Sequence, residues 1–188
     1  MEIFLDDFCV FSKKKNHFKC LGKCMKQCKE FGISLNSDKC QFGMPFGRLL
    51  GHVVSRTGIS TDPDKIRVLV QLPIPTTVSK VRAFLGHASY YRRFIHLFAV
   101  ICNPLTNLLK KTEPGMSPVW TEECTQAFEE LKRKLTNTPI LIAPRWKEMF
   151  HVYVDASNVA IGSVLSQKDA KGCDHPIYYT SRQLIPAE

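Results

Sequence analysis

Apolar residues recur every three or four positions in several stretches of the chain, which is the spacing of an amphipathic helix. In the first stretch they run from Phe18 to Phe31, and Gly32 follows where a helix commonly ends. A second stretch opens with the segment 61–64, in which an aspartate precedes the proline of a first helical turn, and prolines close it after Val70. Helices are therefore predicted near 18–31 and 61–70.

Two further helices are predicted in the middle of the chain. Apolar positions from Val78 to Phe98 trace one helical face, with basic residues along its rim. Thr121 precedes two glutamates and an apolar stripe that ends at Leu135, so we expect the threonine to cap this helix. Pro139 then ends the helical pattern, because proline removes a backbone donor.

Runs rich in β-branched and aromatic residues predict strands in three regions. At the start, apolar residues flank Asp6 and Asp7 and predict a tight hairpin. Short runs over 39–42 and 49–54 predict a small pair of β-hairpins. A three-stranded meander is predicted from the runs 151–155, 160–166 and 177–180. Helices and strands that follow one another in separate blocks indicate an α+β fold.

Composition narrows the class of protein. The 188 residues carry a formal charge of +9, which favours a polyanionic partner. Among the eight cysteines there is no C-x-x-C pair, and the chain opens on no apolar signal segment, so reduced thiols are expected rather than a secreted disulfide framework. No run of about 18 apolar residues is present. We therefore expect an intracellular protein without a membrane span, in either the cytoplasm or the nucleus.

Three aspartates at two places in the chain are candidates for metal chemistry. Asp6 and Asp7 lie at the tip of the predicted hairpin, where short carboxylates on rigid backbone could hold Mg²⁺ for phosphoryl transfer. Asp155 ends the first strand of the predicted meander and could hold a metal in the same way. Aspartate is also a common turn residue for local hydrogen-bonding reasons, and this simpler interpretation stays open for all three.

One cluster of metal-type residues is interpreted as structural. His17, Cys20, Cys24 and Cys28 fall near one side of a predicted helix. Structural zinc sites usually take their ligands from turns with gaps of two to four residues, and cysteine is among the residues most often buried. Zinc binding is therefore not expected here.

Two basic clusters are candidates for contact with nucleic acid. Lys19, Lys23 and Lys26 share a helical face that could follow a phosphate backbone, although an ordinary solvated face would look the same. The run Tyr90, Tyr91, Arg92 and Arg93 interleaves rings with guanidinium groups, which can stack on bases or bind phosphates. Half-buried packing of the tyrosines is the favoured alternative for this second cluster.

With these residues in view, the chain resembles part of the polymerase polyprotein of gypsy-type long-terminal-repeat retrotransposons. Segment 4–12 is similar to the aspartate hairpin of the polymerase palm, with Phe4 where the motif usually has tyrosine. Segment 50–59 is similar to the region that leads from the palm into the thumb, and segment 84–95 is similar to the thumb signature. Segment 120–132 resembles the next region of the family, and segment 153–167 resembles the opening of a ribonuclease H domain. The matches follow the family order over nearly the whole chain.

The resemblance implies functions and boundaries. It implies an incomplete palm hairpin and helix over 1–60, a helical thumb and connection over 61–115, and an incomplete ribonuclease H-like meander over 116–188. Asp6 and Asp7 would be palm ligands of Mg²⁺, or alternatively Mn²⁺, and Asp155 a ribonuclease H ligand. The implied partners are an RNA template, a DNA primer, an RNA–DNA hybrid and the remaining polymerase segments.

The resemblance also predicts that both active sites are incomplete in this chain. In the family, a third palm aspartate precedes the hairpin, and a glutamate and further aspartates follow the opening of the ribonuclease H domain. We therefore expect a reverse transcriptase and ribonuclease H fragment that is inactive alone. The alternatives are a non-catalytic remnant that binds nucleic acid and a decayed open reading frame.

Overall fold

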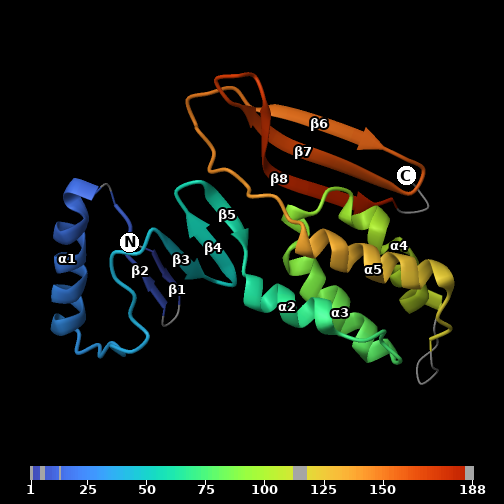
Figure 1. Ribbon diagram of the computed structural model, residues 1–188, viewed down its shortest axis with the longest axis horizontal. Helices are drawn as coiled ribbons and strands as arrows, with labels where there is room; N and C mark the ends of the chain where they lie inside the picture. The colour runs from blue at the N-terminus through green and yellow to red at the C-terminus, as the bar shows by residue number, and fades with distance from the viewer. Residues whose placement is uncertain (1, 5–6, 13, 112–117, 185–188) are drawn as a thin grey trace.

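The computed structural model describes the chain except residues 1, 5–6, 13, 112–117 and 185–188, and it confirms the α+β class. In the described part, one two-stranded and two three-stranded antiparallel sheets are joined by helices. Figure 1 shows the first hairpin and helix at one end of an elongated molecule, with the last sheet over the middle helices at the other end. No helix in the described ranges is long and apolar enough to cross a membrane.

The predicted N-terminal hairpin and helix are both present. Strands β1 (Glu2–Phe4) and β2 (Asp7–Cys9) pair antiparallel, with Phe4 opposite Asp7. A short 3₁₀ turn, η1 (Lys14–Asn16), leads into α1 (His17–Glu30), and Gly32 follows it at a φ of 65°. The helix buries Cys24 and Cys28, whereas Phe18 is 84% exposed.

The second sheet corrects two strand predictions. Residues 39–42 form no strand, because Asn36 organises a local turn in which its side-chain oxygen accepts from the Asp38 N–H at 2.9 Å. The predicted run 49–54 is interrupted by Leu50 and Gly51, whose φ values are 48° and 69°. The chain turns back there, so the sheet consists of β3 (Phe46–Leu49), β4 (His52–Ser55) and β5 (Gly58–Thr61) in that order.

The middle of the chain folds into four helices and one 3₁₀ turn in the described ranges. The elements are α2 (Pro63–Gln71), α3 (Val78–Tyr90), η2 (Arg92–Phe94), α4 (Phe98–Lys111) and α5 (Glu122–Thr136). Asp62, Thr77 and Thr121 cap α2, α3 and α5, since each side chain accepts a hydrogen bond from a backbone N–H of the first turn.

The prediction of one continuous helical face from Val78 to Phe98 was wrong beyond Tyr90. The chain leaves α3 at Tyr91, passes through η2 and reverses at Leu97, which has a φ of 54°. The apolar spacing misled the prediction because Phe94 is buried although it lies on the 3₁₀ turn. The helix around Pro104 in α4 was not predicted, because an internal proline normally argues against a helix.

Buried side chains form two clusters within the described residues. The first joins α3, α4 and α5 and centres on Val81, Phe84 and Phe128. The second joins α2, η2 and α5 and includes Ile66 and Phe94. These clusters make the described residues of the segment 63–136, which are 63–111 and 118–136, the best-packed part of the fold.

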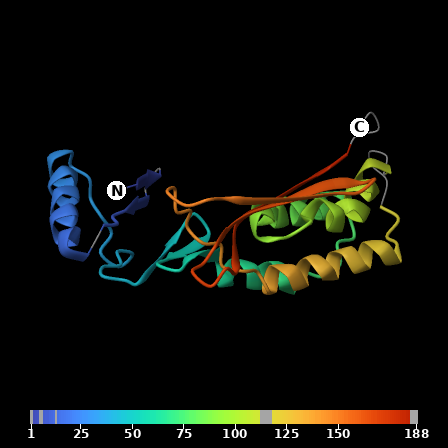
Figure 2. The ribbon, with the colours of Figure 1, turned by 90° about the horizontal axis from the view of Figure 1, so that it is seen from above.

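The predicted C-terminal meander is confirmed. Strands β6 (His151–Ala156), β7 (Ala160–Lys168) and β8 (Asp174–Gln183) pair in sequence order, with a bulge between Leu165 and Ser166. Seen from above in Figure 2, the sheet covers α4. The Ala99 N–H donates to the Ser181 Oγ at 2.8 Å, and Gly162 lies so close to Leu97 that a Cβ there would be 2.4 Å from the leucine Cδ2.

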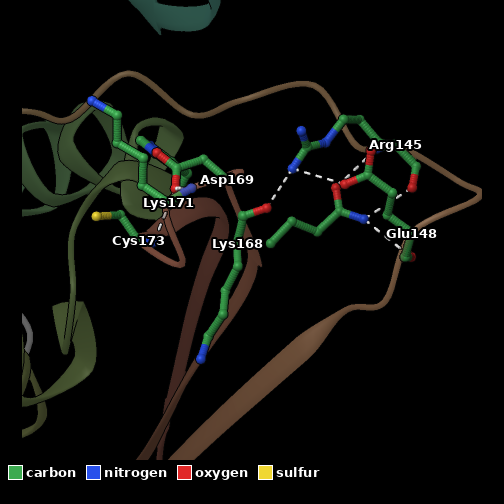
Figure 3. Close-up of polar contacts among 8 residues, drawn as sticks. Arg145, Glu148, Lys168, Asp169, Lys171 and Cys173 are labelled. Atoms are coloured by element: carbon green, nitrogen blue, oxygen red, sulfur yellow. Dashed lines mark hydrogen bonds and ion pairs between the residues drawn. The ribbon is translucent and has the colours of Figure 1, made fainter.

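A buried glutamine fixes the segment that leads into this sheet. The Gln167 side chain is fully buried, accepts from the Arg145 N–H at 2.9 Å and donates to the Arg145 carbonyl at 2.9 Å. The Arg145 guanidinium donates to the Lys168 carbonyl at 2.6 Å and pairs with Glu148 (Figure 3). In the next loop, the Asp169 carboxylate accepts from the backbone N–H groups of Lys171 and Cys173.

Candidate nucleic-acid interface

A groove of about 510 Å³ lies where three parts of the fold meet. Its walls come from the β3–β4–β5 sheet, from the end of α3 with η2, and from β8. Its polar and aromatic lining consists of His52, Ser89, Tyr90, Arg92, Arg93 and Tyr178. Two arginines and several aromatic residues therefore line a common space, which is a suitable composition for binding phosphates and packing against nucleic acid.

The two tyrosines are bonded to the turn between β3 and β4. Tyr90 donates its hydroxyl hydrogen bond to the Leu50 carbonyl, and Tyr91 donates to the Gly51 carbonyl at 2.9 Å. Tyr91 is only 2% exposed, and burial raises the pKa of its phenol to about 12. Tyr90 is 49% exposed, so one ring packs beneath the groove while the other forms part of its wall.

His52 is held in one tautomer at the base of this wall. Its Nδ1 lies 2.9 Å from the Leu50 carbonyl, and a carbonyl only accepts, so Nδ1 carries the hydrogen. Nε2 is buried without a hydrogen-bond partner among the described residues. Burial lowers the pKa of His52, and the nearby charges of Arg93 and Lys65 lower it further. The imidazole is therefore stabilised in its neutral form.

The basic residues at and beside the groove differ in how far their side chains are exposed and in what they contact. Arg92 is exposed, whereas Arg93 is half-buried with its Cζ 5.3 Å from the centre of the Tyr178 ring. Lys65 lies against the β3–β4 turn, since a Cβ at Gly51 would be 3.1 Å from its Nζ. These cations make the rim of the groove electropositive.

An ion pair ties the β3 side of the groove to α2. Arg48 in β3 lies 2.5 Å from the Asp64 carboxylate, which also pairs with Arg67 at 2.6 Å. The hydrogen bond from Arg48 lowers the pKa of Asp64 below its usual value. Because these groups are exposed, the pair orients the sheet more than it stabilises the fold.

Of the three predicted acids, the structure describes the side chain of Asp155 alone. Asp6 lies outside the described residues, and of Asp7 only the backbone is described, at the start of β2. Asp155 is exposed in β6 opposite Gly162. Strand β6 belongs to the sheet at the other end of the molecule from the β1–β2 hairpin (Figure 1). In the described ranges, no three His, Cys, Asp or Glu side chains are grouped so that they could hold a metal. Asp155 by itself does not fit a two-metal site, which needs several oxygen ligands.

The predicted lysine face is separate from the groove. Lys19, Lys23 and Lys26 are all exposed on α1. Helix α1 forms the end of the molecule beyond the β3–β4–β5 sheet, whereas η2 and β8 lie on the other side of that sheet (Figures 1 and 2). The lysines and the arginine pair therefore form two distinct basic surfaces.

Comparison with known proteins gives the chain its family. Residues 120–188 match the model of the RNase H-like domain found in reverse transcriptase. The retrovirus-related Pol polyprotein from transposon opus of Drosophila melanogaster is 37% identical over 99% of this chain, and that from transposon gypsy of the same species is 33% identical over 99%. This chain corresponds to a region of the Pol polyproteins of gypsy-type retrotransposons. It spans 19% and 18% of the lengths of these two relatives.

Solved structures support the same assignment at the level of the fold. The foamy viral protease-reverse transcriptase dRH in complex with double-stranded DNA superposes with a TM-score of 0.82 at 24% identity, covering 95% of this chain and 31% of the viral chain. The foamy viral protease-reverse transcriptase in complex with an RNA/DNA hybrid superposes with a TM-score of 0.79 at 23% identity, covering 94% of this chain and 24% of the viral chain. This Pol region therefore has the fold of the corresponding part of a reverse transcriptase, including the start of the RNase H-like domain.

Two groove residues of this Pol region, and one lysine beside the groove, were missed by sequence reasoning. His52 was noticed only as part of a strand, and Tyr178 only as a residue of the meander. Lys65 was not singled out. The groove brings together residues up to 126 positions apart, since His52 and Tyr178 both line it. No local spacing rule contains that information.

Proposed function

We propose that this Pol region binds the sugar-phosphate backbone of a nucleic-acid duplex in the groove beside η2. The observation that carries the proposal is the pair Arg92 and Arg93, presented on a short 3₁₀ turn to a space lined by aromatic rings. Guanidinium groups form bidentate bonds with phosphates, and such contacts do not depend on the base sequence. The excess positive charge of the chain supports a polyanionic ligand.

An RNA–DNA hybrid or a DNA duplex is the proposed ligand class. The resemblance to reverse transcriptases implies an RNA template and a DNA primer, and similar folds have been solved with double-stranded DNA and with an RNA/DNA hybrid. In this proposal Tyr90 contributes a ring to the groove wall, and Tyr91 acts from below by fixing the β3–β4 turn. Lys19, Lys23 and Lys26 provide a second surface for the backbone farther along the duplex.

Catalysis is proposed to need other parts of the polyprotein. By resemblance, Asp6 and Asp7 would hold Mg²⁺ for RNA-directed DNA synthesis and Asp155 would hold it for hydrolysis of RNA, each with further acids from neighbouring segments. We expect the 188 residues alone to extend no primer and to cleave no hybrid. Metal-dependent extension or cleavage that is lost in Asp7→Asn or Asp155→Asn would contradict this part of the proposal.

The binding proposal is tested with a labelled RNA–DNA hybrid and the full chain. We expect Arg92→Ala and Arg93→Ala each to weaken binding and to reduce the slope of log affinity against log salt by about one. Arg82→Ala is the matched control, because Arg82 is an exposed arginine on α3 that does not line the groove. The groove is excluded as the binding site if all three variants bind alike.

A further inference from the structure

Tyr178 contributes a wall of the groove from a different part of the chain than the arginines. It lies on β8, within the segment that matches the RNase H-like model, whereas Arg92 and Arg93 lie on η2 ahead of that segment. The Arg93 Cζ is 5.3 Å from the centre of the Tyr178 ring. A guanidinium at this distance is attracted by the ring face.

The position of this ring relative to η2 is fixed by contacts around it. The next residue, Tyr179, packs against the second buried cluster, and its ring lies 5.7 Å from that of His96. Farther along β8, Ser181 accepts from the Ala99 N–H. Side chains alternate along a strand, so packing of Tyr179 into the core directs Tyr178 to the other face.

Contact with the Tyr178 ring reduces the rotamer entropy that Arg93 loses when it binds a ligand. Its side chain is half-buried, and the structure gives it the ring contact with Tyr178 in the groove lining. An arginine loses rotamer entropy when a ligand immobilises it, and one that is already oriented loses less. The ring leaves the guanidinium hydrogens free, so it can orient the group without competing with a phosphate for them.

We propose that Tyr178 is a positioning residue that holds the Arg93 guanidinium in the groove for its anionic ligand. This rests on the proposed binding function of the groove and deepens it. The RNase H-like strand β8 thus completes a binding site whose charges come from the preceding part of the chain. The two parts share one ligand site as well as a packing interface.

The proposal is tested by measuring binding of a labelled RNA–DNA hybrid to the full chain carrying Tyr178→Ala or Tyr178→Phe. We expect the alanine variant to bind about two- to fivefold more weakly and the phenylalanine variant to bind like the unchanged chain, because the ring face is retained. Tyr153→Ala is the matched control, since Tyr153 lies in the same sheet but outside the groove. Thermal melting of each variant checks that the sheet still folds.

A double-mutant cycle with Arg93→Ala separates positioning from general loosening of the sheet. If Tyr178 acts through Arg93, Tyr178→Ala has no further effect on binding in the Arg93→Ala background. An undiminished effect in that background, or weak binding by Tyr178→Phe, overturns the positioning role. If Arg93→Ala weakens binding and Tyr178→Ala does not, only this inference fails. If Arg93→Ala alone binds like Arg82→Ala, this inference fails and the groove proposal stands on Arg92. If Arg92→Ala and Arg93→Ala both bind like Arg82→Ala, the groove proposal fails together with it.

Discussion

At the scale of single residues, the main feature is a set of polar groups directed at one tight turn. The Leu50 carbonyl accepts from both Tyr90 and His52, and the Gly51 carbonyl accepts from Tyr91. Both turn residues have positive φ, so the turn has a backbone conformation that costs energy for leucine. Three side-chain donors therefore stabilise a strained turn at the edge of the groove.

His52 makes the stability of this region depend on pH. Its pKa is lowered in the folded chain, mainly by burial, so the unfolded chain takes up the proton first as the pH falls. The contribution of neutral His52 to the free energy of unfolding is complete above about pH 6.5, the usual pKa of histidine. It is lost as the pH falls toward the pKa that His52 has in the folded chain. We expect the melting temperature to decrease over this range, and to decrease less in His52→Gln.

The control for this experiment is His87→Gln, because His87 is exposed on α3 and away from the groove. That variant is expected to keep the pH dependence of the unchanged chain. Equal pH profiles for the two variants would show that His52 does not cause the effect.

At the scale of elements, the sequence predicted those whose signals are local. Helices α2 and α5 follow from a capping residue and a regular apolar stripe, and the meander follows from alternating runs bounded by polar loops. The prediction of a strand at 39–42 was wrong because the Asn36 side chain accepts a hydrogen bond from the Asp38 N–H and so favours a turn just before it. The predicted end of α3 was wrong because Phe94 continues the helical spacing of apolar residues although it lies on a 3₁₀ turn.

The candidate site was predictable only as separate pieces. Arg92 and Arg93 were singled out because rings and guanidinium groups are adjacent in the sequence. The other walls come from residues of β3, β4, β5 and β8, which tertiary packing brings beside η2 and which the sequence pattern does not place there. Asp155 was placed correctly near the end of a strand, but its role as a ligand stays a prediction.

Strand β5 is expected to depend on Gly58. A Cβ at this position would lie 2.1 Å from the Leu141 carbonyl oxygen, and the φ of 141° suits only glycine. The bridge at risk joins Ile59 and Leu141 through two hydrogen bonds of 2.8 and 2.9 Å. We expect Gly58→Ala to lower the free energy of unfolding by about 2 kcal/mol or more in urea titrations.

The matched substitution is Gly86→Ala in α3, where an added Cβ would meet nothing within 4 Å. Alanine suits a helix better than glycine, so this variant should gain roughly 0.5–1 kcal/mol. Opposite signs for the same chemical change are the expected result. A similar loss in both variants would mean that the bridge to Leu141 is not the cause.

At the scale of the whole molecule, packing is uneven along the chain. The helices between Pro63 and Thr136 carry both buried clusters, whereas apolar side chains are exposed at the two ends of the molecule. Phe18 on α1 is 84% exposed, and Val152 and Val154 on β6 are 63% and 66% exposed. Exposed apolar surface of this kind favours association with other surfaces.

Amide hydrogen exchange should follow this unevenness. We expect the slowest exchange in α3 and α5, because their amides are released only when the buried clusters open. Exchange in α1 should be faster, since the helix buries only Cys24 and Cys28 among its described side chains. Exchange in α1 as slow as in α5, together with one sharp cooperative melt, would contradict this expectation.

The glutamine bonds at the entrance to β6 make positions 145 and 167 unequally sensitive to substitution. Gln167 reaches the N–H and the carbonyl of Arg145, which are groups that almost every amino acid carries. Replacement of the arginine side chain therefore leaves both bonds in place, and proline, which lacks the N–H, is the exception. Gln167 has no such latitude, because its own amide makes the bonds. A substitution at position 145 thus removes the guanidinium contacts with Lys168 and Glu148 but keeps both bonds to Gln167, whereas a substitution at position 167 removes both of those bonds.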